Sequence, residues 1–139
     1  MIFVVDASAA LSWVLKSQAS AASDAMLARR RPLDQMVAPD IFNWEVGNVL
    51  LSLRRSRRLS DQTLAESRAS LAAIKIESRP PLSPGAIVEL SHLAGTVGLS
   101  LFDVAYLALA QGLEGTLLSR DERLLSVVTT ARVECLDLR

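Results

Sequence analysis

The sequence predicts an α/β fold in which helices cover both faces of a mainly parallel sheet, an α/β/α sandwich. Short apolar runs rich in β-branched residues alternate with longer segments of helical spacing along the whole chain. Hydrophobic residues make up 50% of the 139 residues and charged residues 22%, as in a compact globular protein. No linker or repeat divides the chain, so we expect a single domain over residues 1–139.

Five segments are expected to be strands. Residues 2–5 form an apolar, β-branched run of the kind found in parallel strands buried on both faces. The other four strands are expected at residues 36–38, 75–78, 115–119 and 133–136.

Helices are expected between these strands because apolar residues recur there at helical spacing. Pro39 suits the first turn of one helix, and Ser60 is the expected N-cap of the next. The predicted helices begin directly after Asp6 and then cover about residues 20–29, 39–58, 60–74, 84–95, 101–111 and 121–128.

Residue scarcity excludes several kinds of catalytic site. Cys135 is the only cysteine and His92 the only histidine, so neither an internal disulfide nor a Cys/His zinc site can form. A Ser-His-Asp or Cys-His site would have to use His92, which lies in an ordinary amphipathic stretch. Glycine-rich phosphate-binding motifs are also missing. The chemistry that remains is that of carboxylates.

The apolar segments indicate a soluble protein of the reducing cytoplasm with no membrane partner. The apolar N-terminus is interrupted at Asp6 and lacks the basic region and cleavage site of a signal peptide. The longest other apolar stretch contains Asp103, which argues against a spanning helix. Basic and acidic residues number 15 each, so any basic surface must be local.

Two acids are expected where strands end. Asp6 and Asp121 follow the first and fourth predicted strands, and ligands of open α/β sheets bind beyond the carboxyl ends of the strands. Either Asp6 or Ser8 could instead cap the first helix. We favour a functional role, because Asp6 and Asp121 occupy equivalent positions.

A third acid interrupts a helix that is apolar on nearly every side. Asp103 is the only charged residue between residues 99 and 110, a segment whose pattern predicts a buried helix. A capping box with Ser100 is the alternative explanation of Asp103, and it does not exclude a ligand at the same helix end.

The fourth acid is Glu45, in the helix that follows Pro39. The expected core stripe of this helix is Phe42, Val46, Val49 and Leu53. Glu45 and Asn48 begin a polar row that borders this stripe. Spacing alone leaves a solvated glutamate as plausible as a functional one.

Four carboxylates in one cleft would repel one another unless a cation held them together. Oxygen ligands without His or Cys favour Mg²⁺ or Mn²⁺. Such a site suits hydrolysis of a phosphodiester by a metal-held water.

Four sequence motifs, in this order and spacing, resemble those of PIN-domain ribonucleases. The similarity is greatest to the VapC toxins of bacterial toxin–antitoxin pairs. The motifs are Val4-Val5-Asp6-Ala7-Ser8, Pro39 with Glu45-Val-Gly-Asn48-Val-Leu50, Leu101-Phe-Asp103 through Ala110, and Leu117-Leu-Ser119-Arg-Asp121.

The resemblance implies a site, an activity and partners. Asp6, Glu45, Asp103 and Asp121 would form the metal site, the hydroxyls of Ser8 and Ser119 would assist, and Asn48 is a further supporting candidate. Ser119 stands where the family usually has Thr, which keeps the hydroxyl. The implied activity is an Mg²⁺- or Mn²⁺-dependent endoribonuclease that leaves 5′-phosphate and 3′-hydroxyl ends. The implied partners are an RNA substrate, a VapB-like antitoxin and a second copy of the chain.

Two other functions remain open. One is a PIN-like binding module without catalysis, and the other is a PIN nuclease that processes RNA outside a toxin–antitoxin pair. Phosphoacceptor domains and haloacid-type phosphatases fit poorly, since neither Lys16 nor Lys75 follows a late strand and Ser8 stands where a phosphatase needs Asp.

The basic residues are mostly arginines, which suit phosphate recognition. Candidates for RNA binding are Arg54, Arg55, Arg57, Arg58 and Arg120. The run at 54–58 could equally stabilise a helix C-terminus. Ile41, Trp44 and Leu51 lie off the core stripe of their helix and could form an apolar face for a partner, or belong to the core.

Overall fold

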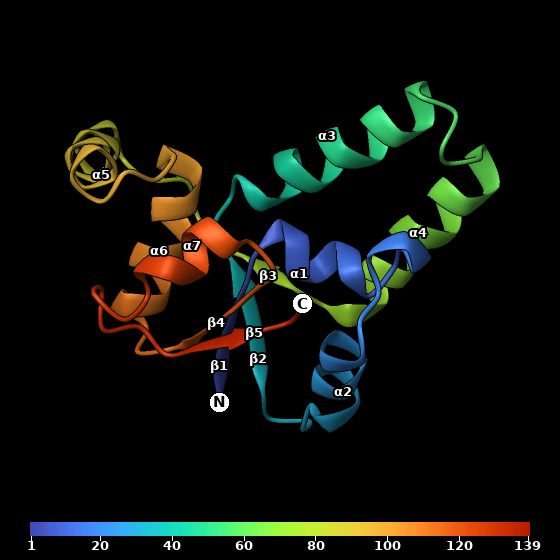
Figure 1. Ribbon diagram of the computed structural model, residues 1–139, viewed down its shortest axis with the longest axis horizontal. Coiled ribbons are helices and arrows are strands. Elements are labelled where there is room, and N and C mark those ends of the chain that lie inside the picture. The colour runs from blue at the N-terminus through green and yellow to red at the C-terminus, as the bar shows by residue number, and fades with distance from the viewer.

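The computed structural model, which describes residues 1–139, contains one five-stranded sheet in which every neighbouring pair of strands is parallel (Figure 1). The strand order is β3-β2-β1-β4-β5. The strands are β1 (Ile2–Val5), β2 (Gln35–Ala38), β3 (Glu77–Ser78), β4 (Thr116–Ser119) and β5 (Cys135–Asp137). The predicted α/β fold is confirmed, and the sheet is wholly parallel.

Seven α-helices and one short 3-10 helix connect the strands. They are α1 (Ala7–Ser12), η1 (Lys16–Gln18), α2 (Ala21–Arg29), α3 (Phe42–Arg55), α4 (Asp61–Ile74), α5 (Pro84–Val97), α6 (Leu101–Gly112) and α7 (Glu122–Val127). Serine side chains cap several of them, as Ser60 does for α4 and Ser100 for α6.

The strand order determines which helices cover which face. From β1 to β3 the chain moves one way across the sheet, and from β3 to β5 it moves back. With right-handed connections, α1 to α4 therefore lie over one face and α5 to α7 over the other. In Figure 1, α3 and α4 extend from the body on one side, while α6 and α7 lie on the opposite side of the strands. The carboxyl ends of all five strands meet at a single edge.

The helix predicted for residues 39–58 is three residues shorter at each end. Residues 39–41 form a turn before α3, and Pro39 therefore lies outside the helix rather than in its first turn. At the other end, Arg57 has a φ of 56°, a left-handed conformation that cannot continue a right-handed helix. The third strand is also shorter than predicted, and the fifth begins two residues later.

The core lies between the central strands and the helices on each face. Val4, Val5 and Leu117 are fully buried on the two central strands β1 and β4. In α3 the expected core stripe is partly wrong: Leu50 is buried, whereas Val49 and Leu53 are only partly covered.

No single helix is long and apolar enough to cross a membrane. Together α5 and α6 reach the required length and composition, but the two helices meet at a bend of 105°.

Candidate active site

The four acids singled out by the sequence lie at the carboxyl edge of the sheet. Asp6 directly follows β1, and Asp121 comes two residues after β4. Glu45 lies in the first turn of α3, and Asp103 in the first turn of α6. Asp121 and Glu45 both act electrostatically with Asp6, and Asp103 does so with Glu45. The fold thus brings together acids that are up to 115 residues apart, from 6 to 121 in the chain.

Asp6 is the most buried of these acids, with 4% of its surface exposed. Its carboxylate accepts hydrogen bonds from the Ser8 hydroxyl at 2.8 Å, the Ala9 backbone N–H at 2.7 Å and the Ser119 hydroxyl. Burial raises the pKa of Asp6, and the nearby charge of Asp121 raises it further, although the three donors oppose the rise. No lysine or arginine side chain pairs with this carboxylate.

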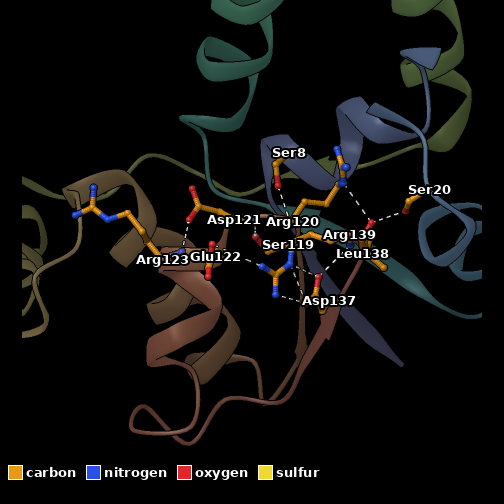
Figure 2. A network of polar contacts seen from close by, with 10 residues as sticks. All are labelled: Ser8, Ser20, Ser119, Arg120, Asp121, Glu122, Arg123, Asp137, Leu138 and Arg139. Atoms are coloured by element: carbon orange, nitrogen blue, oxygen red, sulfur yellow. Dashed lines mark hydrogen bonds and ion pairs between the residues drawn. The ribbon is translucent and has the colours of Figure 1, made fainter. Parts of the chain in front are cut away.

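The two serines that hold Asp6 also join two loops of the chain. The Ser8 hydroxyl, after β1, accepts the Arg120 backbone N–H at 2.9 Å. The Ser119 hydroxyl accepts the Asp121 backbone N–H, also at 2.9 Å. Figure 2 shows the first bond, between the start of α1 and the end of β4, and the second within the loop that follows β4. Ser8 thus binds Asp6 and the backbone of the loop after β4, whereas Ser119 binds Asp6 and the backbone of its own loop.

Glu45 is half-buried and is held by a residue that sequence reasoning missed. The Tyr106 hydroxyl, on α6, donates to Glu45 Oε2 at 2.5 Å. Burial raises the pKa of Glu45, and the charges of Asp103 and Asp6 add to the rise. Burial also raises the pKa of Tyr106 and keeps the phenol protonated. Tyr106 lies three residues beyond Asp103 on the same helix face, a spacing that could have pointed to it.

Asp103 and Asp121 are capping residues of their own helices, as Asp6 is of α1. Asp103 Oδ2 accepts from the Ser100 hydroxyl at 2.6 Å and completes the expected capping box. Asp121 Oδ1 accepts the backbone N–H of Arg123 at 2.7 Å. In each acid the second carboxylate oxygen accepts no hydrogen bond from the protein. The same is true of Glu45 Oε1.

The donor set fits a hard divalent cation in its chemistry. The edge offers carboxylate and hydroxyl oxygens only, the ligands that Mg²⁺ and Mn²⁺ prefer. As the side chains lie, however, no three of these acids are close enough to hold one metal ion together. The unpaired oxygens of Asp103, Asp121 and Glu45 would have to approach Asp6 to do so.

The remaining candidates lie at different distances from the acids. Asn48 is exposed, one turn beyond Glu45, and its side chain makes no hydrogen bond. Arg120 is next to the site, and its Nε donates to the Leu138 carbonyl at 3.2 Å (Figure 2). The run at 54–58 begins nine residues beyond Glu45, about 14 Å along the helix axis. His92 is exposed on α5.

Two of these arginines have local polar partners. Arg54 pairs with Asp61 of α4, and Arg58 Nε donates to the Ser56 hydroxyl at 3.2 Å. Arg55 and Arg57 are exposed and form no ion pair.

The acids lie on an open edge of the molecule. Asp121 is exposed and Glu45 and Asp103 are partly exposed, so solvent reaches three of the four acids. Trp44, the neighbour of Glu45, is 79% exposed and therefore lies outside the core.

Comparison with protein families decides between the possible relatives of this fold. The family model of the PIN domain matches residues 3–129. The chain belongs to the PIN domain family. PIN domains are generally nucleases that use divalent metal ions. No curated protein sequence matches the chain.

Solved structures agree with this assignment at the level of the fold. PAE2754 from Pyrobaculum aerophilum is 20% identical with a TM-score of 0.64, over 91% of this chain and 84% of that one. VapBC-1 from nontypeable Haemophilus influenzae is 13% identical with a TM-score of 0.63, over 99% and 98%. VapBC2 from Rickettsia felis, bound to a DNA fragment from their promoter, is 12% identical with a TM-score of 0.68, over 100% of both chains.

Proposed function

We propose that this PIN domain is an Mg²⁺- or Mn²⁺-dependent endoribonuclease and acts as the VapC-like toxin of a toxin–antitoxin pair. The observation that supports it most is the gathering of Asp6, Glu45, Asp103 and Asp121 at one open edge of the sheet. Asp6 and Glu45 are desolvated there without a basic partner, which favours a site completed by a cation.

The proposed roles follow from the hydrogen bonds. Asp6 would bind the cation as its most buried ligand, held by Ser8 and Ser119. Glu45, Asp103 and Asp121 would each contribute the carboxylate oxygen that accepts no protein hydrogen bond. When bound, the metal supplies an acidified water and charge stabilisation for hydrolysis of a phosphodiester.

An RNA substrate fits the surface around the acids. The edge is open, and α3 leads from Glu45 to exposed Arg55 and Arg57. Asn48 lies between them on the polar row, where it could hydrogen-bond a phosphate or sugar. Arg120 lies beside Asp121 at the other side of the site. Arginine guanidinium groups match phosphate geometry through paired donors.

The partner proposed is a VapB-like antitoxin, together with a second copy of the chain. Two of the similar structures are VapBC complexes by name. Trp44 and Leu51 are exposed on α3, and Ile41 is partly covered, so this apolar row has room for a partner. We further propose that residues 1–139 form a single domain acting in the cytoplasm.

Cleavage assays on the purified chain test the activity. RNA should be cut with Mg²⁺ or Mn²⁺ and left intact in excess chelator. Asp6→Asn and Asp103→Asn should abolish cleavage while far-UV circular dichroism stays unchanged. Asp24→Asn, at an exposed position of α2, is the matched control and should cleave normally. Full cleavage in chelator would contradict the proposed chemistry.

Expression in cells tests the biological role. Sequencing of RNA ends after induction would identify the substrate, and growth arrest that requires Asp6 would support a toxin. Activity on a processing intermediate without growth arrest would favour a PIN nuclease outside a toxin–antitoxin pair.

A PIN-like binding module is the second candidate, and one observation favours it. No three acids are close enough to hold one metal ion as they lie. A module of this kind would bind no Mn²⁺ at millimolar concentration, so a calorimetric titration with Mn²⁺ separates it from the nuclease.

A further inference from the structure

Tyr106 is a buried polar side chain at the edge of the site whose position suggests a function. It is the only tyrosine of the chain and is 2% exposed on α6. Its hydroxyl donates to Glu45 Oε2 at 2.5 Å. No other side-chain hydrogen bond joins α6 to α3.

The Tyr106 hydroxyl lies close to the acids of the candidate site. The charges of Glu45 and Asp6 both act on the phenol, so both acids lie near it. Asp103, a third acid, lies one turn earlier on the same face of α6. A buried phenol needs a partner for its proton, and Glu45 provides it.

Glu45 would be poorly positioned without this bond. A glutamate side chain has several rotatable bonds, and on a half-exposed helix face it gains conformational entropy by pointing into water. Repulsion from Asp103 and Asp6 also favours its departure from the site. The bond occupies Oε2 and leaves Oε1 unpaired.

We propose that Tyr106 is a positioning residue that holds the Glu45 carboxylate at the site by one oxygen, so that the other is available to a divalent cation. This inference rests on the proposed metal-dependent nuclease. It goes beyond that function because it states that a residue of α6 determines how the Glu45 side chain is oriented. Tyr106 acts through Glu45 and does not itself bind the metal.

Mn²⁺ binding to the full metal-free chain tests the inference without any RNA. Calorimetry should show that Tyr106→Phe weakens Mn²⁺ affinity by about 10- to 100-fold, as the loss of partners behind metal ligands generally does. Trp13→Phe is the matched control, because it removes another aromatic donor bond, from Trp13 Nε1 to the Ser23 carbonyl at 2.9 Å. It should lower the melting temperature and leave Mn²⁺ affinity unchanged.

A double-mutant cycle shows whether Tyr106 acts through Glu45. In the Glu45→Gln background, Tyr106→Phe should have no further effect on Mn²⁺ affinity. An equal loss in both backgrounds would overturn the inference. If the unaltered chain binds Mn²⁺ and Tyr106→Phe binds it equally well, the inference fails and the proposed function stands. If the unaltered chain binds no Mn²⁺, both fail.

A second measurement needs no substitution of Tyr106. Because the chain has a single tyrosine, 3-fluorotyrosine gives a single fluorine resonance. This resonance should shift when Mg²⁺ is added and should shift in Glu45→Gln without metal. A resonance that Mg²⁺ leaves unchanged, in a protein that calorimetry shows to bind Mg²⁺, would refute the link between Tyr106 and the metal ligand.

Discussion

Replacement of Ser119 by alanine should show how strongly the protein supports the Asp6 carboxylate. Ser119 is fully buried, donates to Asp6 and accepts the Asp121 backbone N–H. A hydrogen bond to a charged group contributes about 1.5–3 kcal/mol, and a buried N–H without a partner costs about 1–3 kcal/mol. Asp121 is exposed enough for water to reach its N–H. We therefore expect Ser119→Ala to lose about 2–4 kcal/mol at pH 8.

The pH dependence of this loss is the sharper test. Asp6 has a raised pKa in the folded chain, so its ionisation lowers stability as the pH rises from the unfolded to the folded pKa. The Ser119 bond lowers that pKa, and its removal raises the pKa further. The destabilisation by Ser119→Ala should therefore be smallest at low pH, where Asp6 is protonated in both proteins, and grow as the pH rises.

Urea unfolding in chelator, followed by circular dichroism over a pH series from pH 8 down to the lowest pH at which the chain folds, measures both effects. Ser119→Thr keeps the hydroxyl and should keep the pH dependence of the unaltered chain, whatever its added methyl group costs. Ser70→Ala, at an exposed site of α4, should change stability by no more than about 0.5 kcal/mol. A loss for Ser119→Ala that stays the same over the whole pH range in which the chain folds would refute the inference that Ser119 stabilises the ionised form of Asp6.

Three further outcomes are expected. RNA products should carry 5′-phosphate and 3′-hydroxyl ends, and 2′,3′-cyclic phosphate as the main product would indicate attack by the RNA itself. The double substitution Arg55→Gln and Arg57→Gln should reduce the slope of log RNA affinity against log salt concentration by about 0.7 per lost contact on single strands. The control substitutions Arg29→Gln and Arg31→Gln, at the opposite edge of the sheet, should leave this slope unchanged. If the slope is unchanged for Arg55→Gln and Arg57→Gln but their Tm is lower, the role of this pair is structural. Asp34→Asn should destabilise the chain at pH 7, because the terminal ammonium 2.8 Å away lowers the pKa of Asp34, and melts should show the difference vanish as the pH falls through that pKa.

The alternation of strands and helices could be predicted because it depends on local periodicity. The β-branched run at residues 2–5 favoured a buried strand, and the apolar segment around Asp103 favoured a buried helix, as β1 and most of α6 are, although Phe102 is exposed. The helix boundaries could not be predicted to the residue: α3 ends at Arg55 because residue 57 turns left-handed, which no property of arginine demands.

The acids of the candidate site could be predicted from the sequence, but the hydrogen bonds that hold them could not. Asp6 and Asp121 follow strands, so the general rule for parallel sheets placed them at one edge. The bond from Tyr106 to Glu45 joins residues 61 positions apart, a pairing that depends on how α3 and α6 meet. The hydroxyls of Ser8 and Ser119 were expected to assist only through the family resemblance, and the bond that Ser8 accepts from the Arg120 backbone could be seen only in the folded chain.

The serine bonds give the hydrogens around Asp6 a fixed order. The Arg120 and Asp121 backbone N–H groups point at the two serine oxygens, and both serine protons point at the carboxylate. Together with the Ala9 N–H, every hydrogen-bonding partner of Asp6 is a donor. A protonated Asp6 would have to donate to a serine oxygen that already accepts a backbone N–H, and that serine would have to turn its own proton away, whereas a cation at the open side would leave all the protons where they are. All the hydrogen bonds of this network therefore point towards a negatively charged Asp6. A cation should bind and leave without any rearrangement of the protons on the two serines.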